Sequence, residues 1–448
     1  MKKIIFNLFI FLLFCSCDNK QKTVFVGKII KPTNDEIQLL KDEELIDKIS
    51  INDDGTFKTY VNLKKDGLYN FFLQPEFQYL IINKGDSLVL RLNSLDFDES
   101  LVFTGKGSEK NNYLINLFLQ SEMEESFIRE KYFSKKLVFR STIDSLINIK
   151  RKELSVFKSN VKINKTTELI LENAMILPLL THIEKYILRN KKLHNDNIIY
   201  FANYRNNINY NIDDLSHFKP YLDYITIKSI NQSFGINEGF DYSLNFNLNR
   251  LKFIENNVFN TTIKNKLLRF IAYEYLLEEK LLINIDSFIH EFEKISSNTK
   301  TNNEIKELYT NIVALQVGKK IPSISLIERN GNIKDIGSIK NSKNIFTFWS
   351  YDQNAHQVNL FNKIQLYSKD NLDYNFYLIN INKDFDKWKF NIINQFPQQN
   401  IKNYKTMNFE NMSKKMVLNN LNKVIITKDG IIEEIINFTD LELFLKNN

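Results

Sequence analysis

Few side chains in this sequence could act as thiol nucleophiles or as sulfur or imidazole ligands of a transition metal. The 448 residues include two cysteines and five histidines. Both cysteines, Cys15 and Cys17, lie near the N-terminus. The histidines are scattered over the rest of the chain, at His182, His194, His217, His290 and His356. Thiol chemistry and zinc chemistry need paired cysteines or clustered ligands, so this distribution favours neither.

The short patterns that combine a histidine with a glutamate are incomplete. His290-Glu291 is not followed by the second histidine, four residues after the first, that a zinc protease requires. His182-Ile183-Glu184 lacks the cysteine pair of a zinc deaminase. Glu274, Glu278 and Glu279 could place two carboxylates on one helix face, but a charged face of this kind is usually solvated. The sequence therefore predicts no catalytic residue, no metal site and no cofactor.

The N-terminal residues have the pattern of an export signal. Lys2 and Lys3 precede a mostly apolar run over residues 4–14. A short basic segment followed by an apolar run of this length is typical of a signal peptide. The run is too short to cross a bilayer, which takes roughly 20 apolar residues. A signal anchor that stays attached is the alternative, but the way the run ends argues against it.

The apolar run ends in a sequence that resembles a bacterial lipobox. In Leu13-Phe14-Cys15-Ser16-Cys17, Ser16 is the small residue before an acylated Cys17. Cys15 is the alternative site, although the bulky Phe14 would then precede the cleaved bond. We therefore expect residues 1–17 to form a lipoprotein signal peptide and lipidation site, with palmitate or a similar acyl chain on Cys17.

This N-terminus predicts both a location and a lack of thiols. Cleavage before Cys17 removes Cys15, and acylation consumes the Cys17 sulfur, so the mature chain would have no free thiol and no disulfide. We expect a lipid-anchored protein of the cell envelope, at the outer membrane and facing the periplasm, although residues 18–22 contain no decisive sorting signal. The expected partners are the membrane, through the lipid, and another envelope protein or a peptide.

Composition places the rest of the chain among globular proteins. Hydrophobic residues make up 43% and charged residues 25% of the sequence, which is ordinary for folded domains, and the length allows two to four of them. The net charge of +7 comes from basic residues interspersed with acidic ones. No Lys/Arg stripe with interleaved aromatic residues occurs, so nucleic acid is not an expected partner.

Residues 22–107 are predicted to form a β-rich domain. Short apolar segments such as 24–30 and 37–40 are separated by turn residues. Asp-Gly pairs at residues 54–55 and 66–67 stand between such segments, which is the strongest short-range signal for a hairpin. We therefore expect an antiparallel β-sandwich or a small barrel.

Residues 108–316 are predicted to form a helical middle region. Apolar residues recur every three to four positions over long stretches, as from 168 to 189. Pro178 interrupts this stripe and should kink or split the helix. Asn-rich stretches near 205–213 and 231–249 are interpreted as loops.

Residues 317–448 alternate strands and helices. The elements expected in order are strand 324–327, strand 344–350, helix 355–367, strand 374–381, helix 386–396 ended by Pro397, strand 424–427, strand 431–436 and a last helix from Thr439. A βαβ unit followed by a β-hairpin and a closing helix forms an α/β domain. Together the three regions predict an α+β multidomain protein.

The C-terminal order of elements and four short motifs resemble the TlpA-type branch of thioredoxin-like envelope lipoproteins. The motifs are Gly318-Lys319-Lys320-Ile321-Pro322, Asn330-Gly331, Phe348-Trp349 and residues 421–430. The β-rich region resembles the domain of unknown function that precedes such domains in lipoproteins of Bacteroidota, in its DGTF, GLYNF, NKGDSLVL and FTGKGSEKNNYL segments. The resemblance implies a thioredoxin fold over residues 317–448 and, in the family, thiol–disulfide exchange at a Cys-x-x-Cys motif just after the Phe-Trp pair.

The same resemblance implies that this chemistry is lost. Aligned at Phe348-Trp349, the Cys-x-x-Cys positions hold Gln353-Asn354-Ala355-His356. The family's first cysteine works as a thiolate at a helix N-terminus, and neither glutamine nor histidine can form or resolve a mixed disulfide. Leu421 stands where the family has a cis-proline. Trp349 is interpreted as a core residue, with a place on the rim of a binding groove as the alternative.

Two classes of function are compatible with these features. The first is a lipid-anchored envelope protein whose redox-inactive thioredoxin-like domain is a non-catalytic binding or scaffolding module, and the lack of thiols favours it. The second is an enzyme, either a divergent thiol–disulfide oxidoreductase-family protein that borrows a partner's thiols or an unrecognised hydrolase acting through the helical region. His356 could serve such an enzyme as a base or metal ligand, but a packed or surface histidine is the simpler interpretation.

Overall fold

The computed structural model describes residues 22–234, 243–279, 281–339, 342–392, 395–396 and 398–447. The expected signal peptide, with Cys15 and Cys17, lies outside these residues, as does Pro397. The chain forms two compact units that divide between Leu267 and Leu268. This division falls inside the region predicted as the helical domain, so the domain boundaries at 108 and 316 stay predictions.

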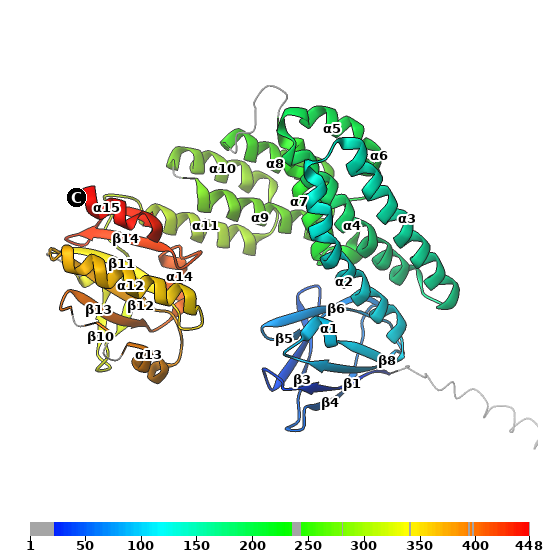
Figure 1. Ribbon diagram of the computed structural model, residues 1–448, viewed down its shortest axis with the longest axis horizontal. Coiled ribbons are helices and arrows are strands. Elements are labelled where there is room, and N and C mark those ends of the chain that lie inside the picture. Colours follow the sequence, from blue (N-terminus) through cyan, green and yellow to red (C-terminus); the bar gives the residue numbers. More distant parts are fainter. Residues whose placement is uncertain are drawn as a thin grey trace, which may run out of the picture. The chain divides into compact units, whose positions relative to one another are not determined.

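The first unit begins with two four-stranded sheets (Figure 1). Their strands are β1 (Thr23–Ile30), β2 (Glu36–Lys41), β3 (Glu44–Ser50), β4 (Thr56–Val61), β5 (Gly67–Leu73), β6 (Glu76–Ile82), β7 (Ser87–Asn93) and β8 (Val102–Lys106), with the short helix α1 (Phe97–Ser100) before β8. The strand orders are β4-β1-β7-β8 and β3-β2-β5-β6. The buried rings of Phe25 on β1 and Phe71 on β5 lie 6.0 Å apart, edge to face, in a core shared by both sheets. The two sheets therefore form a sandwich.

One strand pair differs from the antiparallel arrangement predicted for this region. β1 lies antiparallel to β4 but parallel to β7. Hairpin turns predict only pairs of strands that follow each other in the sequence, whereas β1 and β7 become neighbours when the chain crosses back from the second sheet. The Val24 N–H donates to the Asp86 carbonyl at 2.9 Å, which holds the beginnings of the two strands together.

Helices follow the sandwich from residue 108 onward. They are α2 (Ser108–Glu130), α3 (Lys136–Asn160), α4 (Lys165–Arg189), α5 (His194–Tyr200), α6 (Ala202–Arg205), α7 (Lys219–Ser233), α8 (Leu244–Asn257) and the first part of α9 (Thr261–Glu278). Three short 3₁₀ helices lie between them, η1 (Lys131–Phe133), η2 (Lys191–Leu193) and η3 (Asp213–Leu215).

One of the two outcomes predicted for Pro178 and one loop prediction are wrong. Pro178 does not split α4, because the buried Leu177 and Leu179 on either side hold the helix in the core and offset the lost backbone hydrogen bond. The alternative, a kink, stays a prediction. The stretch 231–249 is not all loop, since α8 begins at Leu244. Its buried Phe246, Leu251 and Ile254 supply an apolar face that the many intervening asparagines obscure in the sequence.

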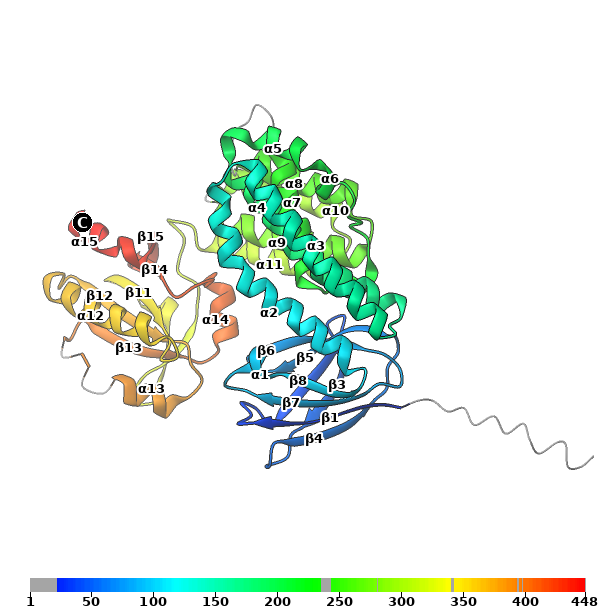
Figure 2. The same ribbon diagram turned by 45° about the vertical axis from the view of Figure 1, so that its right-hand side comes forward.

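Helix α2 joins the sandwich to the helices (Figures 1 and 2). In its first turn, Lys110 forms a buried ion pair with Asp86, with 2.6 Å between Nζ and Oδ2. Asn112 pairs with the backbone of Phe103 on β8: its Nδ2 donates to the carbonyl at 2.8 Å and its Oδ1 accepts from the N–H at 2.9 Å. The sandwich and these helices therefore pack as one unit.

The second unit contains the end of α9, two more helices and a seven-stranded sheet. Its elements are α10 (Leu282–Ile295), α11 (Thr299–Ala314), β9 (Ser325–Ile327), β10 (Ile333–Asp335), η4 (Ile336–Ser338), β11 (Lys343–Trp349), α12 (Asn354–Asp370), β12 (Tyr374–Asn380), α13 (Phe385–Ile392), β13 (Ile401–Thr406), α14 (Phe409–Lys415), β14 (Lys423–Lys428), β15 (Ile431–Asn437), η5 (Phe438–Asp440) and α15 (Leu441–Asn447). The strand order is β10-β9-β13-β12-β11-β14-β15. α12, α13 and α15 contribute Leu360, Trp388 and Leu441 to a single core on the sheet.

The arrangement of this sheet is the one expected from the thioredoxin resemblance. β11 and β12 are parallel and connected by α12, and the hairpin β14–β15 lies antiparallel beside β11. Two strands, β10 and β13, and the helix α14 are missing from the sequence prediction. β13 is rich in polar residues, but it pairs parallel with β12 and buries Lys405, whose Nζ donates to the Thr406 carbonyl at 3.2 Å. Its pairing with β12 and with β9 on the other side identifies it as a strand.

Candidate functional site

The site predicted from the sequence lies where β11 ends and α12 begins. Gln353 is the residue just before α12, and its carbonyl accepts the first helical hydrogen bond from the Gln357 N–H at 2.9 Å. Its side chain is exposed and does not cap the helix. The N–H groups of the first helical turn, which carry the positive end of the helix dipole, are therefore left for another acceptor.

His356 lies in the first turn of α12 and is partly buried. Both ring nitrogens are shielded from solvent, and neither has a hydrogen-bond partner within 3.5 Å. Burial lowers the pKa of His356, and the nearby backbone of Leu421 acts weakly in the opposite direction. The ring is therefore neutral at neutral pH and is poorly placed to act as a base toward a dissolved substrate.

The structure brings Leu421 beside His356, although the two residues are far apart in the sequence. Leu421 lies two residues before β14, which pairs with β11, and the sequence prediction assigns Leu421 and His356 to the positions of the family's cis-proline and second cysteine. Nearby, the Lys423 ammonium donates to the carbonyls of Met416 at 3.0 Å and Val417 at 2.8 Å. Burial lowers the pKa of Lys423 to about 8.

Trp349 belongs to the core. Its side chain is fully buried, and its ring lies edge to face against Phe361 with 4.8 Å between the centroids. A ring in this position cannot line a groove, so the alternative interpretation of Trp349 as a groove residue is wrong. Its role is to fix the end of β11 against α12.

An asparagine network that sequence reasoning missed connects the loops after β11 and β12. Asn382 donates from Nδ2 to Asp352 at 2.6 Å, and its Oδ1 accepts from the Tyr351 N–H at 3.0 Å. The Asn382 N–H donates to Oδ1 of the buried Asn380 at 3.0 Å. The sequence feature that could have revealed this network is the Asn-x-Asn pattern, Asn380 and Asn382, at the end of β12. β12 is parallel to β11, and parallel strands bring their carboxyl ends to the same edge of a sheet.

This edge of the sheet offers hydrogen bonds rather than reactive groups. Asn354 and Ala355 are exposed beside Gln353, and no cysteine occurs among the described residues. The groups available are the N–H donors of the α12 N-terminus and the polar loop at Asp352. An arrangement of this kind can bind a peptide or another acceptor-rich segment, but it contains no nucleophile for disulfide exchange.

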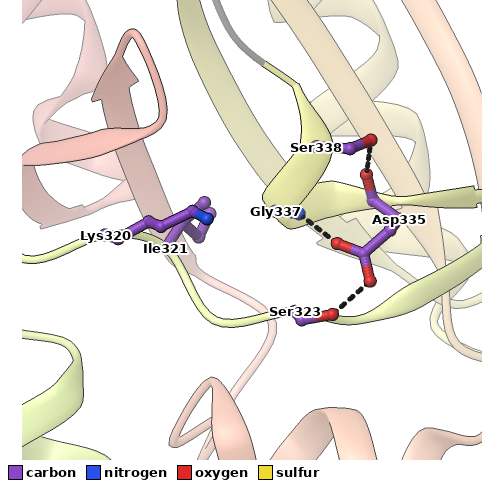
Figure 3. A pocket seen from close by; sticks show the side chains of 6 residues that line it. All are labelled: Lys320, Ile321, Ser323, Asp335, Gly337 and Ser338. Atoms are coloured by element: carbon purple, nitrogen blue, oxygen red, sulfur yellow. Dashed lines mark hydrogen bonds between the residues drawn. The ribbon is translucent and has the colours of Figure 1, made fainter.

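A second feature of the same unit is a pocket of about 530 Å³ below η4 (Figure 3). It is lined by Lys320, Ile321, Ser323, Asp335, Gly337 and Ser338. One Asp335 oxygen accepts from the Gly337 N–H at 2.6 Å and the other from the Ser323 hydroxyl. Because both carboxylate oxygens already have donors, Asp335 stabilises the turn rather than presenting a free charge to a ligand.

Among the described residues, no group of three or more His, Cys, Asp or Glu side chains could hold a metal ion. Within the same part of the chain, no helix combines the length and the apolar character needed to cross a bilayer.

Comparison with known proteins gives matches only among solved structures. No family model and no curated protein matches the chain. A thioredoxin domain of a thiol-disulfide oxidoreductase from Bacteroides vulgatus is 16% identical, with 30% of this chain and 97% of that chain covered and a TM-score of 0.25. The C-terminal domain of a putative thiol-disulfide oxidoreductase from Bacteroides thetaiotaomicron is 17% identical, with coverages of 30% and 99% and a TM-score of 0.26. A thioredoxin-like protein from Bacteroides caccae is 12% identical, with coverages of 60% and 93% and a TM-score of 0.35.

These likenesses are too distant to transfer any activity. The C-terminal region is thioredoxin-like by its own strand order, with the parallel β11–α12–β12 unit and the β14–β15 hairpin beside it. A fold by itself does not specify a function.

Proposed function

We propose that this chain is a lipid-anchored cell-envelope protein whose thioredoxin-like domain binds a partner protein or peptide without redox chemistry. One observation carries the proposal: Gln353 directly precedes α12 and His356 lies in its first turn, and the sequence alignment assigns these two residues to the cysteine positions of a redox-active relative. The first is an exposed amide and the second a shielded, neutral ring. The helix N-terminus keeps its capacity to bind acceptors while the electron-transferring groups are gone.

The binding role can be tested by crosslinking at the N-terminus of α12. A photo-crosslinking side chain at the exposed Asn354 should capture a defined partner in intact envelopes. Ala355→Arg should block this capture, because the long side chain would cover the first helical turn. Asn359→Arg, at an exposed position one turn further along α12, is the matched control. Equal capture by both variants would contradict a binding site at this end of the helix.

The lack of redox activity can be tested independently. Insulin reduction by a chemical reductant should proceed at the same rate with and without the purified chain, because no residue after Cys17 carries a thiol. A rate well above the blank would favour the alternative, an oxidoreductase-family enzyme that uses its partner's thiols.

The anchor can be tested by metabolic labelling with a fatty-acid analogue. We expect label on the wild-type chain and none on Cys17→Ala. Loss of label in Cys15→Ala instead would move the acylated residue, and no label on any variant would refute the lipid anchor.

A further inference from the structure

One end of the first unit gathers apolar and basic side chains from two distant segments. We name it the basic end and define it as residues 129–140, around η1 and the start of α3, together with residues 185–199, from the end of α4 through α5 (Figure 1). The segments are in direct contact: the Tyr186 hydroxyl donates to the Ser134 carbonyl at 3.0 Å. The basic end lies at the opposite end of the 23-residue α2 from the sandwich, about 33 Å away at 1.5 Å per residue.

Large apolar side chains protrude from the basic end. Phe133 is 77% exposed, Ile199 75% and Leu137 69%, and Leu193 is also exposed. Single exposed apolar residues are common, but a cluster on one end of a domain marks an interaction surface. The Arg189 guanidinium lies 4.2 Å from the centroid of the Phe133 ring.

Basic residues outnumber acidic ones in the basic end, although Arg129 pairs with Glu125 and Arg140 with Asp144 just outside its segments. Its segments contain nine basic and two acidic residues. The basic ones are Arg129, Lys131, Lys135, Lys136, Arg140, Lys185, Arg189, Lys191 and Lys192, and the acidic ones are Glu130 and Asp196. Whatever covers this surface must therefore combine negative charge with an apolar interior.

We propose that the basic end docks on an anionic lipid bilayer, with Phe133, Leu137 and Ile199 inserted at the level of the headgroups. Aromatic and aliphatic side chains surrounded by Lys and Arg are the composition of interfacial membrane-binding surfaces. Each basic residue near an anionic leaflet adds attraction that falls off within a Debye length. An acidic protein partner is the competing occupant. Leu137 and Ile199 protrude without lining a groove, whereas Phe133 also borders one.

A groove beside the basic end distinguishes the two occupants. It has a volume of about 960 Å³ and is lined by basic-end residues such as Arg129 and Arg189 and by Glu122 and Glu125, further back along α2. A bilayer resting on the helix ends leaves this groove empty, whereas a protein partner of the basic end would have to accommodate its carboxylates. The docking does not depend on the binding role of the thioredoxin-like domain, and it adds a second attachment to the proposed acyl anchor. A single acyl chain binds membranes only weakly, and a basic patch is one of the signals that make attachment stable.

The test uses the chain without residues 1–17, so that no acyl chain contributes, and sedimentation with lipid vesicles. We expect binding to vesicles of phosphatidylglycerol and phosphatidylethanolamine, and at least tenfold weaker binding to vesicles of phosphatidylcholine alone. Raising the salt concentration from about 0.1 M to about 1 M, which shortens the Debye length from about 10 Å to about 3 Å, should release the protein.

Two double variants and two matched controls locate the contact. Lys135→Glu with Lys136→Glu, and Phe133→Ser with Leu137→Ser, should each weaken binding to anionic vesicles at least tenfold while circular dichroism stays unchanged. The control for the charge variant is Lys369→Glu with Lys402→Glu, which changes the net charge by the same amount at exposed sites of the second unit. The control for the apolar variant is Leu372→Ser, which removes a side chain of the second unit that is 78% exposed. Both controls should bind like the wild type.

Three results would overturn the proposal. These are no binding to anionic vesicles, equal binding to neutral vesicles, and binding that the basic-end variants do not weaken. Binding of a synthetic Glu/Leu peptide that depends on Lys135 and Lys136, without any vesicle binding, would assign the surface to an acidic protein partner instead.

Discussion

The side-chain amide of Asn111 pairs with the backbone of Ile81 as a neighbouring strand would. Its Oδ1 accepts from the Ile81 N–H at 2.8 Å, and its Nδ2 donates to the Ile81 carbonyl at 2.9 Å. Ile81 lies on β6, at the edge of one sheet, and the next residue of α2, Asn112, does the same for Phe103 at the edge of the other. Two consecutive asparagines of one helix thus satisfy an open edge of each sheet, which otherwise presents unpaired backbone groups.

Asn111→Ala should lower the free energy of unfolding of the first unit by about 2–4 kcal/mol. The substitution leaves the N–H and carbonyl of the buried Ile81 unpaired, and each unsatisfied buried group costs about 1–3 kcal/mol. Asn173→Ala is the control, because Asn173 donates to the Leu169 carbonyl within its own helix. Urea unfolding followed by circular dichroism measures both. Equal losses for the two variants would show that the Asn111 pairing is not a special stabilising contact.

Glu184→Gln should destabilise the first unit by about 3–5 kcal/mol. The fully buried Glu184 binds Arg205 with both oxygens, at 2.8 Å and 3.1 Å, and lies 3.8 Å from the Lys228 ammonium. Removing the negative charge leaves two buried cations uncompensated. Glu172→Gln, which disrupts an exposed pair with Lys158, should cost less than about 1 kcal/mol. Thermal and urea unfolding of the two variants provide the comparison, and a loss below about 1 kcal/mol for Glu184→Gln would contradict it.

Stability should fall as the pH is lowered from about 6.5 to about 4, in part through His182. Burial lowers the pKa of His182 to about 4, and its Nδ1 lies 2.5 Å from the Tyr132 hydroxyl. Between these pH values the unfolded chain binds a proton at His182 that the folded chain does not bind. The free energy of unfolding therefore falls by on the order of 3 kcal/mol over this pH range. His182→Gln should reduce this loss, whereas His290→Gln, at an exposed site, should not. Identical pH profiles for wild type and His182→Gln would refute the assignment.

Gln353→Cys with His356→Cys should form a reversible disulfide under mild oxidant. The two positions flank the first turn of α12, where the backbone before the helix can adjust, and side chains three apart on a helix are neighbours. Asn359→Cys with Asn362→Cys has the same spacing in the middle of α12, where the rigid helix should prevent closure. Thiol titration before and after oxidation measures both pairs. If the first pair stays reduced in a folded protein, the alignment with the thioredoxin motif is wrong.

The sequence by itself determined the features that depend on short-range patterns. The strand that ends in Phe348-Trp349, the helix after it and the β14–β15 hairpin follow from apolar periodicities and an Asp-Gly turn, which act within a few residues. The lack of thiols after Cys17 is a property of the sequence alone, and it limits the chemistry of any fold that the chain adopts. The core position of Trp349 followed from its place at the end of an apolar strand.

Only the tertiary structure decided which distant residues meet. The parallel pairing of β1 with β7, the recruitment of the polar β13 and the contacts of Asn111 and Asn112 depend on segments far apart in the chain. The basic end is likewise assembled from two segments separated by most of α3 and α4. Such pairings leave no local pattern, because their stability comes from burying surfaces and satisfying backbone groups that approach each other only after the chain has folded.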